Sequence, residues 1–441
     1  MKASTPPDSS NERYVPGHGD PSFDVLSYDL VLDYSLESNH LAGRAVITAV
    51  ARQEIERFSL DLHHLQASKV KIDASPVAKF AQRRGKLVVR PRSPLSVDQT
   101  FTVAVTYSGV PQPMPGLDGD AGWEELADGV IVASQPHGAP SWFPCNDRPD
   151  DKATYRFEVS APTDYVVVAN GSMTSRRRRA GATTWVYEEP SPMATYLATL
   201  QVGRYVSTPA DDSDVPMVTI HPPDTDGRHA AAFSRQGAMM ALFVDRFGPY
   251  PFDRYSAVVT ADELEIPLEA QGLSIFGSTF VTDDWQVQRL IAHELAHQWF
   301  GNSLTLRYWR DIWLHEGFAC YAEWLWSEES GGQSARQQAE SHWGRLARAP
   351  ADLVLSDPGP DLMFDDRVYK RGALTLHALR LTVGDDAFFT LLRTWSQRHR
   401  HGSVTTEMFV DLVDELCDLD AGPFFEAWLR GLKVPELPPE R

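Results

Sequence analysis

The chain has 441 residues, which is too long for a single hydrophobic core. Its 42% hydrophobic content is enough to fill the cores of two large domains. Its 60 acidic against 41 basic side chains give a formal net charge of −19, which argues against nucleic acid as a partner because the charge repels phosphate backbones. A membrane partner is also unexpected, since no run of about 18 apolar residues occurs.

Cysteine usage points to a reducing compartment. The only cysteines are Cys145, Cys320 and Cys417, so at least one stays unpaired in any disulfide scheme, and none belongs to a CxxC pair. The first 23 residues lack the apolar core of a signal peptide. These features predict a cytoplasmic protein.

The first half of the chain predicts a β-rich domain. Residues 1–20 are rich in Pro, Ser, Asp and Gly, and we expect a mobile tail or a strap across the surface there. Over residues 21–206, short alternating runs such as YDLVLDYSL, TFTVAVTYSG and DYVVVANG are separated by turn residues, which favours a β-sandwich. Arg176 to Arg179 lie between two predicted strands, and in an acidic protein they indicate a solvated hairpin tip.

The second half predicts a mostly α-helical domain over residues 207–441. Apolar residues recur with helical spacing in AAFSRQGAMMALFVDRFG, VQRLIAHELAHQWFG and RGALTLHALRLTVG. The fold class that we expect is therefore multidomain, β first and then α+β.

One predicted helix carries a metal-binding pattern, His293-Glu294-x-x-His297. Residues four apart on a helix lie about 40° apart around the axis and about 6 Å along it, so both imidazoles can reach one ion. Glu294 points roughly 100° away from His293, which leaves it free to contact a water in the metal's open position. With 14 histidines in the chain, however, this pattern arises by chance at odds of about one in thirty, so a third ligand is needed.

Glu316 is the candidate third ligand. It follows His297 by 19 residues, within residues 311–323, which predict a second amphipathic helix. Two histidines and a glutamate with one open position suit a single zinc ion. Glu294 would then accept a proton from water as it attacks a carbonyl and deliver that proton to the leaving amine.

These motifs resemble the aminopeptidase N family of gluzincin zinc metallopeptidases. HELAHQWFGN and DIWLHEGFACYAE are similar to the family's HELAHQWFGN and DLWLNEGFASYVE, and the similarity extends to SYDLVLDYSLESNHLAGRAVITA and WFPCNDRPDDKATYRFEV. The resemblance implies a β-sandwich saddle followed by a thermolysin-like, mostly helical catalytic domain, and hydrolysis of the first peptide bond of peptides with a free N-terminus. The chain resembles a short member that lacks the C-terminal helical domain, so we expect a cleft that is more open or is covered by another subunit.

The resemblance also implies a second catalytic residue. Tyr369, in RVYKRGALTL, is similar to the tyrosine of the family's Tyr-x-x-Gly-Ala segment, which donates a hydrogen bond to the tetrahedral oxyanion. A phenol suits this role because it stays protonated at neutral pH. The alternative is a buried core tyrosine near the start of a helix.

Two substrate-binding residues follow in the same way. Glu269, in IPLEAQGL, is similar to the glutamate that binds the substrate's α-ammonium in relatives, although the usual neighbouring Gly and Asn are absent. That difference leaves open how the edge strand binds the substrate backbone. The alternative for Glu269 is a surface carboxylate without a role in binding. Gln135, in VASQPHGAPSWFPC, is similar in position to a saddle glutamine that reaches the substrate pocket, and an ordinary loop glutamine is its alternative.

Two further residues flank the predicted metal site. His315 stands beside Glu316 where the family usually has asparagine, so it could alter the surroundings of the metal or compete as a ligand. Glu323 lies seven residues after Glu316 on the same helical face, and either binds a ligand imidazole or is a surface acid.

Other functions remain open from the sequence. One is an endopeptidase or a hydrolase of lipid epoxides, as in one branch of the family. Another is a zinc-stabilised peptide-binding protein with a decayed site, which is disfavoured because Glu294 and Tyr369 are both present. The preferred first residue, the physiological substrate and the oligomeric state do not follow from the sequence.

Overall fold

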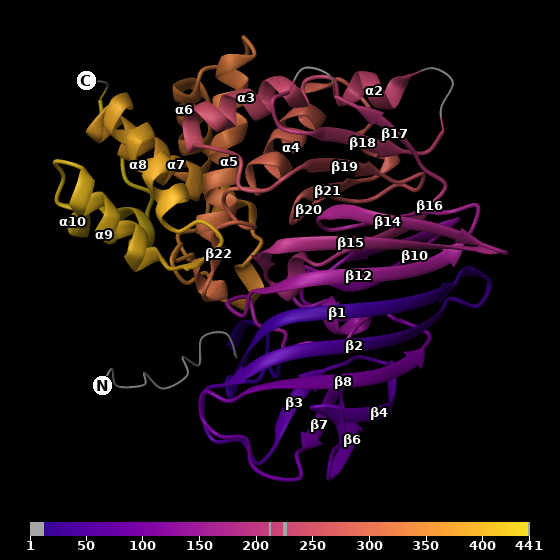
Figure 1. Ribbon diagram of the computed structural model, residues 1–441. Helices are drawn as coiled ribbons and strands as arrows, with labels where there is room; N and C mark the ends of the chain where they lie inside the picture. Colours follow the sequence, from indigo (N-terminus) through magenta and orange to yellow (C-terminus); the bar gives the residue numbers. More distant parts are fainter. Residues whose placement is uncertain (1–12, 211–212, 224–226, 440–441) are drawn as a thin grey trace.

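The structure, a computed structural model, describes residues 13–210, 213–223 and 227–439. Strands dominate the first half of the chain and helices the second (Figure 1). The expected fold class, a β-rich part followed by a mostly helical part, is confirmed. Buried apolar side chains of both parts belong to one continuous core, so the two parts are packed against each other.

Within the described residues, three sheets form the β-rich part. The largest has eight strands, in the order β14 (Ser172–Arg179), β15 (Ala182–Met193), β12 (Ala153–Pro162), β1 (Phe23–Ser35), β2 (His40–Ala51), β8 (Thr100–Gly109), β4 (Gln66–Ile72) and β5 (Ser75–Pro76). A five-stranded sheet has the order β13 (Val166–Ala169), β16 (Leu200–Gly203), β11 (Gly129–Ala133), β10 (Gly119–Leu126) and β9 (Met114–Gly116). A three-stranded sheet has the order β3 (Phe58–Asp61), β7 (Lys86–Arg90) and β6 (Lys79–Arg83).

Alternating burial explains why the central strand β1 forms. Leu30, Leu32 and Tyr34 are buried on one face, while Val31 and the residues between them are more exposed. A strand buries every second side chain, so this alternation places the apolar face of β1 on the core. Leu30 pairs with Ala45 of β2 and with Phe157 of β12, which sets the register of the sheet at its centre.

The helical part also contains a five-stranded sheet. Its order is β17 (Val206–Pro209), β18 (Met217–His221), β19 (Tyr255–Val259), β21 (Leu273–Phe276) and β20 (Leu268–Ala270), and a short pair joins β22 (Thr305–Leu306) to β23 (Ser403–Val404). The α-helices are α2 (Arg228–Ala232), α3 (Gln236–Phe247), α4 (Trp285–Ala296), α5 (Trp313–Glu329), α6 (Ala335–Leu346), α7 (Asp366–Val383), α8 (Asp385–Arg398), α9 (Thr406–Leu416) and α10 (Ala421–Phe425). Single 3-10 turns cover Leu36–Ser38, Ala139–Ser141, Thr195–Leu197, Ser278–Phe280, Trp309–Asp311 and Pro360–Leu362, and a π-helical turn covers Glu426–Arg430.

Residues 13–20 join the two parts. The Tyr14 hydroxyl donates a hydrogen bond to Asp357 at 2.6 Å and accepts one from the Gly359 amide at 2.8 Å. His18 contacts Asp147 of the β-rich part, with 2.7 Å between Nδ1 and Oδ2. The sequence predicts a mobile tail or a surface strap over residues 1–20. Residues 13–20 bridge the two parts, and residues 1–12 lie outside the described residues.

The arginine run differs from the prediction. Arg176 to Arg179 belong to strand β14, at the edge of the large sheet, rather than to the hairpin tip, which follows at Ala180 and Gly181. All four are exposed, and the Arg176 guanidinium lies over the Trp185 ring at 4.2 Å. Pairing with β15 extends to Arg179 because a tight turn with Gly181 at φ +80° reverses the chain there.

Over the described ranges, no helix is both long and apolar enough to cross a membrane.

Candidate metal centre and active site

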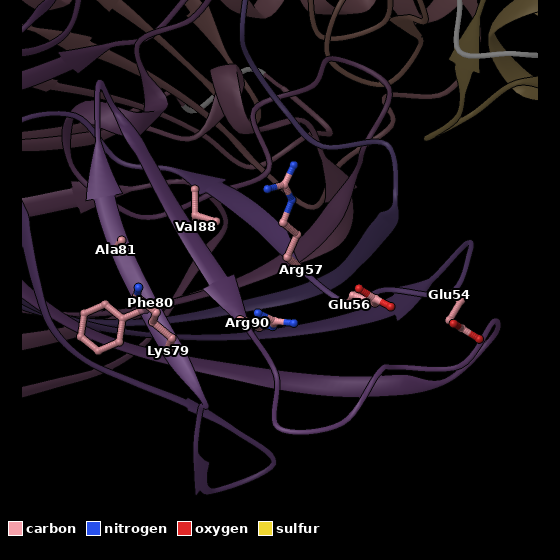
Figure 2. Close-up of a pocket in the computed structure, with 8 residues that line it drawn as sticks. All are labelled: Glu54, Glu56, Arg57, Lys79, Phe80, Ala81, Val88 and Arg90. Carbon is pink, nitrogen blue, oxygen red and sulfur yellow. The ribbon is translucent and has the colours of Figure 1, made fainter.

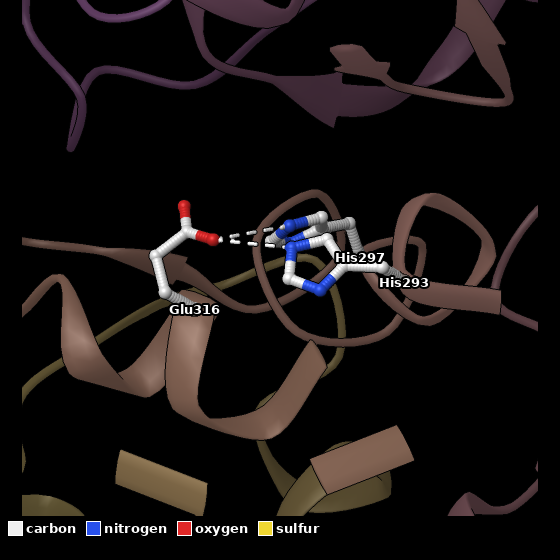
Figure 3. Close-up of side chains that lie close together, drawn as sticks. All are labelled: His293, His297 and Glu316. Atoms are coloured by element: carbon white, nitrogen blue, oxygen red, sulfur yellow. Dashed lines mark hydrogen bonds and ion pairs between the residues drawn. The ribbon is translucent and has the colours of Figure 1, made fainter. Parts of the chain in front are cut away.

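Two buried helices bring the three predicted ligands together. His293 lies on α4, His297 follows its last residue, and Glu316 lies in the first turn of α5. Glu316 Oε2 is 3.3 Å from His293 Nε2 and 3.5 Å from His297 Nε2 (Figure 3). All three side chains are buried, and one donor atom from each lies within 4.8 Å of the others.

The hydrogen bonds of the two histidines suit metal binding. His297 Nδ1 is 2.9 Å from the Phe300 carbonyl, which can only accept, so Nδ1 carries a proton and Nε2 is the nitrogen left to bind a metal. His293 Nδ1 is 2.9 Å from Glu323 Oε1, which assigns the same tautomer. Two imidazole Nε2 atoms and one carboxylate oxygen thus face a common point, and this donor set fits a zinc ion.

Glu323 is the partner of a candidate ligand rather than a surface acid. It is 3% exposed, and Arg289 donates to its second oxygen at 3.2 Å. Burial opposes its ionisation, but Lys370, His293 and Arg289 lower the pKa of Glu323 to about 2. The carboxylate is therefore charged at neutral pH and orients the His293 ring.

His315 takes no part in the cluster. Its Nε2 accepts a hydrogen bond from the Leu306 amide at 2.9 Å, so this nitrogen is occupied by backbone. Burial lowers the pKa of His315 to about 3, which keeps the ring neutral. No group of metal-donor side chains among the described residues includes it.

Glu294 lies beside this centre, and one oxygen of its carboxylate is free to bind a water molecule. Its carboxylate is buried, and Oε2 has no hydrogen-bond partner within the described part of the chain. Burial raises the pKa of Glu294 to about 8, although His293 and His297 act against the rise. A carboxylate whose pKa lies near neutrality is suited to accept and return a proton.

Glu269 and Gln135 meet although 134 positions separate them in the sequence. Gln135, which follows β11, donates from Nε2 to Glu269 Oε1 at 2.7 Å. Glu269 lies on β20, is 4% exposed, and has a carboxylate oxygen within 4.8 Å of donor atoms of Glu294 and His297. A buried carboxylate from the helical part and an amide from the β-rich part therefore stand together beside the metal cluster.

Tyr369 lies at the start of α7. The Asp365 side chain accepts from the Arg367 amide at 2.9 Å and caps this helix, which sets the direction of its first turn. The Tyr369 ring centroid is 5.9 Å from that of His293. Desolvation and the nearby Glu316 raise the pKa of Tyr369 well above its ordinary value, so its hydroxyl remains a donor.

Gln298 and Asn302 also belong to the site, although no motif in the sequence predicts a role for either. Both are fully buried, and both bind the hairpin that carries Glu269. Their one signal in the sequence is their place in the HELAHQWFGN segment, where Gln298 directly follows His297 and Asn302 is the last residue.

A hollow on the β-rich part lies apart from these residues. Figure 2 shows side chains from β6, β7 and the loop before β3 around it, namely Glu54, Glu56, Arg57, Lys79, Phe80, Ala81, Val88 and Arg90. Its charged lining consists of two acids and three bases, and it contains none of the predicted site residues.

Family comparisons match both parts of the chain. The Peptidase M1 N-terminal domain matches residues 25–197, and the Peptidase family M1 domain matches residues 231–428. Endoplasmic reticulum aminopeptidase 1 of Homo sapiens is 24% identical over 431 residues, which are 90% of this chain and 46% of that protein. Leucyl aminopeptidase of Saccharolobus solfataricus is 24% identical over 433 residues, covering 92% of this chain and 53% of that protein. The chain thus spans about half the length of these relatives.

Solved structures match over nearly the whole chain. The crystal structure of an M1 zinc metallopeptidase from Deinococcus radiodurans is 32% identical, with a TM-score of 0.89, and the match covers 97% of this chain and 99% of that one. A mutant of that metallopeptidase bound to the substrate Tyr-Ser-Ala has the same identity and TM-score, with coverage of 98% and 100%.

Proposed function

Because the chain belongs to peptidase family M1, we propose that it is a zinc-dependent aminopeptidase that hydrolyses the first peptide bond of peptides. The observation that carries this proposal is a pair of buried groups that share His297: one joins it to His293 and Glu316, and the other joins it to Glu294 and Glu269. A metal-binding group, a base and a carboxylate for the substrate's ammonium are the parts that an aminopeptidase needs.

In the proposed reaction, His293, His297 and Glu316 hold the ion. When bound, zinc supplies Lewis acidity, which polarises the scissile carbonyl and lowers the pKa of a water molecule. Glu294 accepts the proton of the attacking water and delivers it to the leaving amine. Tyr369 donates a hydrogen bond to the oxyanion that develops on the carbonyl oxygen.

Glu269 gives the site its preference for a free N-terminus. A substrate ammonium would form a charge-assisted hydrogen bond with this carboxylate, while Gln135 orients it through the 2.7 Å contact. Holding the ammonium there places the first peptide bond, and no later one, beside Glu294.

Hydrolysis of fluorogenic aminoacyl amides by the purified protein tests the proposal. We expect cleavage of free aminoacyl substrates and little cleavage of their N-acetylated forms. A chelator should abolish the activity and added zinc should restore it, since the donor set depends on the ion. Equal cleavage of acetylated peptides would indicate an endopeptidase, and no cleavage of any peptide would favour a binding protein or an epoxide hydrolase.

Glu269→Ala is expected to raise KM for free aminoacyl substrates by about 10- to 100-fold, because a hydrogen bond to a charged group contributes about 1.5 to 3 kcal/mol. Steady-state kinetics on free and N-acetylated substrates would measure the change, and the acetylated forms should remain poor. Glu265→Ala is the matched control, because Glu265 is an exposed carboxylate just before the same strand. An unchanged preference for the free N-terminus in Glu269→Ala would contradict the assigned role.

We also propose that the protein works in a reducing compartment such as the cytoplasm. Cys145, Cys320 and Cys417 are all unpaired and buried, which supports this location because none forms a disulfide.

A further inference from the structure

The hairpin that carries Glu269 is bound to the chain segment that carries His297. Gln298 follows His297 directly and is fully buried. Its Oε1 accepts from the Gly272 amide at 2.9 Å, and its Nε2 donates to the Ala270 carbonyl at 3.1 Å. One side chain thus binds the turn and the last residue of β20 at the same time.

Asn302 strengthens the same connection. Its Nδ2 donates to the Ala270 carbonyl at 2.9 Å, so this oxygen accepts from two buried amides of the segment after α4. Ala270 is the neighbour of Glu269, as Gln298 is the neighbour of His297. The two hydrogen bonds therefore couple the backbone at the ammonium-binding carboxylate to the backbone at a metal ligand.

The position of β20 explains why such a connection matters. This strand of three residues is at the edge of its sheet, and β21 is its one partner among the described strands. The turn after it contains Gly272 at φ +75°, a conformation that only a residue without a side chain adopts readily. A short edge strand with one neighbour has few backbone hydrogen bonds of its own, so side chains from outside the sheet decide where it lies.

Other contacts hold the turn to its own sheet and to the β-rich part. The Ser256 amide of β19 donates to the Gly272 carbonyl at 3.0 Å. Asn170 donates to the Gln271 carbonyl at 2.9 Å, and Gln271 donates to the Ser191 carbonyl at 3.1 Å. These bonds hold the turn against the β-rich part and do not reach the metal-binding segment. Gln298 and Asn302 supply the direct link between β20 and that segment.

We propose that Gln298, assisted by Asn302, is a positioning residue that fixes the Glu269 carboxylate relative to the metal ligands and so selects the first peptide bond. The inference rests on the proposed aminopeptidase function. A peptide held by its ammonium reacts only when its first carbonyl lies beside the metal and Glu294, and a misplacement of about 1 Å can cost about 100-fold in rate.

Gln298→Met tests this role because methionine has a similar shape and lacks both the donor and the acceptor. We expect the variant to fold and to bind zinc as the parent does, since His293, His297 and Glu316 are untouched. kcat/KM for free aminoacyl amides should fall by about tenfold or more, because a displaced Glu269 binds the ammonium less well, which raises KM, and misplaces the first carbonyl, which lowers kcat. The preference for free over N-acetylated substrates should fall as well. If Gln298 only stabilised the fold, the substitution would lower the amount of active enzyme and leave KM unchanged.

Gln288→Met is the matched control. Gln288 lies on α4, the helix that precedes Gln298 in the chain, and is 2% exposed. It donates one buried hydrogen bond to the Ala232 carbonyl at 2.9 Å, away from β20. This variant should lose stability without a change in KM or in selectivity. Asn302→Ala is a second variant that removes only one of the two bonds to Ala270, so it should act in the same direction with a smaller effect.

Hydrogen exchange provides a readout that does not need activity. The amides of residues 268–273 should exchange faster in Gln298→Met than in the parent or in Gln288→Met, because the hairpin loses its link to the metal-binding segment. A folded, zinc-binding Gln298→Met enzyme with parental KM, selectivity and exchange would overturn the inference. An inactive parent would instead contradict the proposed function, while the exchange measurement would still test the link itself.

Discussion

Glu294→Gln is expected to lower kcat by about 100- to 10,000-fold, the range that a general base contributes, while the zinc content stays at the parental level. The amide keeps the size and shape of the carboxylate but cannot accept a proton from water. Zinc content should not change because His293, His297 and Glu316 supply the donor atoms and Glu294 adjoins them without being needed as a ligand. Metal analysis and steady-state kinetics on the same preparation would measure both quantities.

A matched control separates this effect from the removal of a negative charge. Glu329→Gln changes the same residue type at the exposed end of α5 and should leave kcat and zinc content unchanged. If Glu294→Gln hydrolysed aminoacyl amides at the parental rate, another group would have to act as the base. If it lost zinc, Glu294 would be a ligand and the mechanism would need a different set of residues.

Tyr369→Phe is expected to lower kcat by about 100- to 1,000-fold, because that is the usual effect of removing one donor to an oxyanion. The phenylalanine ring keeps the 5.9 Å packing against His293, so the variant should fold and bind zinc. KM should change less than kcat, since the hydrogen bond forms mainly in the transition state.

Tyr321→Phe is the control for this prediction. Tyr321 is a buried tyrosine on α5 whose hydroxyl lies 3.3 Å from His377 Nδ1, outside the metal cluster. Its loss should affect stability and leave kcat unchanged. Parental turnover in Tyr369→Phe would favour the simpler view of Tyr369 as a packing residue of α7.

The sequence by itself determined what depends on near neighbours along the chain. The alternation in β1 and the helical spacing around His293 were enough to predict the order of the β-rich and helical parts, because both periods reflect local backbone geometry. The same spacing indicated that two imidazoles share one helix face. The bounds of β14 were less predictable, since its arginines pair with β15 through backbone atoms that no side-chain pattern reports.

Only the tertiary structure decided which distant residues meet. The contact between Gln135 and Glu269 joins segments 134 positions apart, and Tyr14 reaches Asp357 across 343 positions. Gln298 looks like any polar residue in the sequence, yet its two hydrogen bonds to the Glu269 hairpin appear once α4 is packed beside β20. The physical reason is that periodicity records which face of an element is apolar, while the approach of two elements depends on how all the buried side chains between them pack.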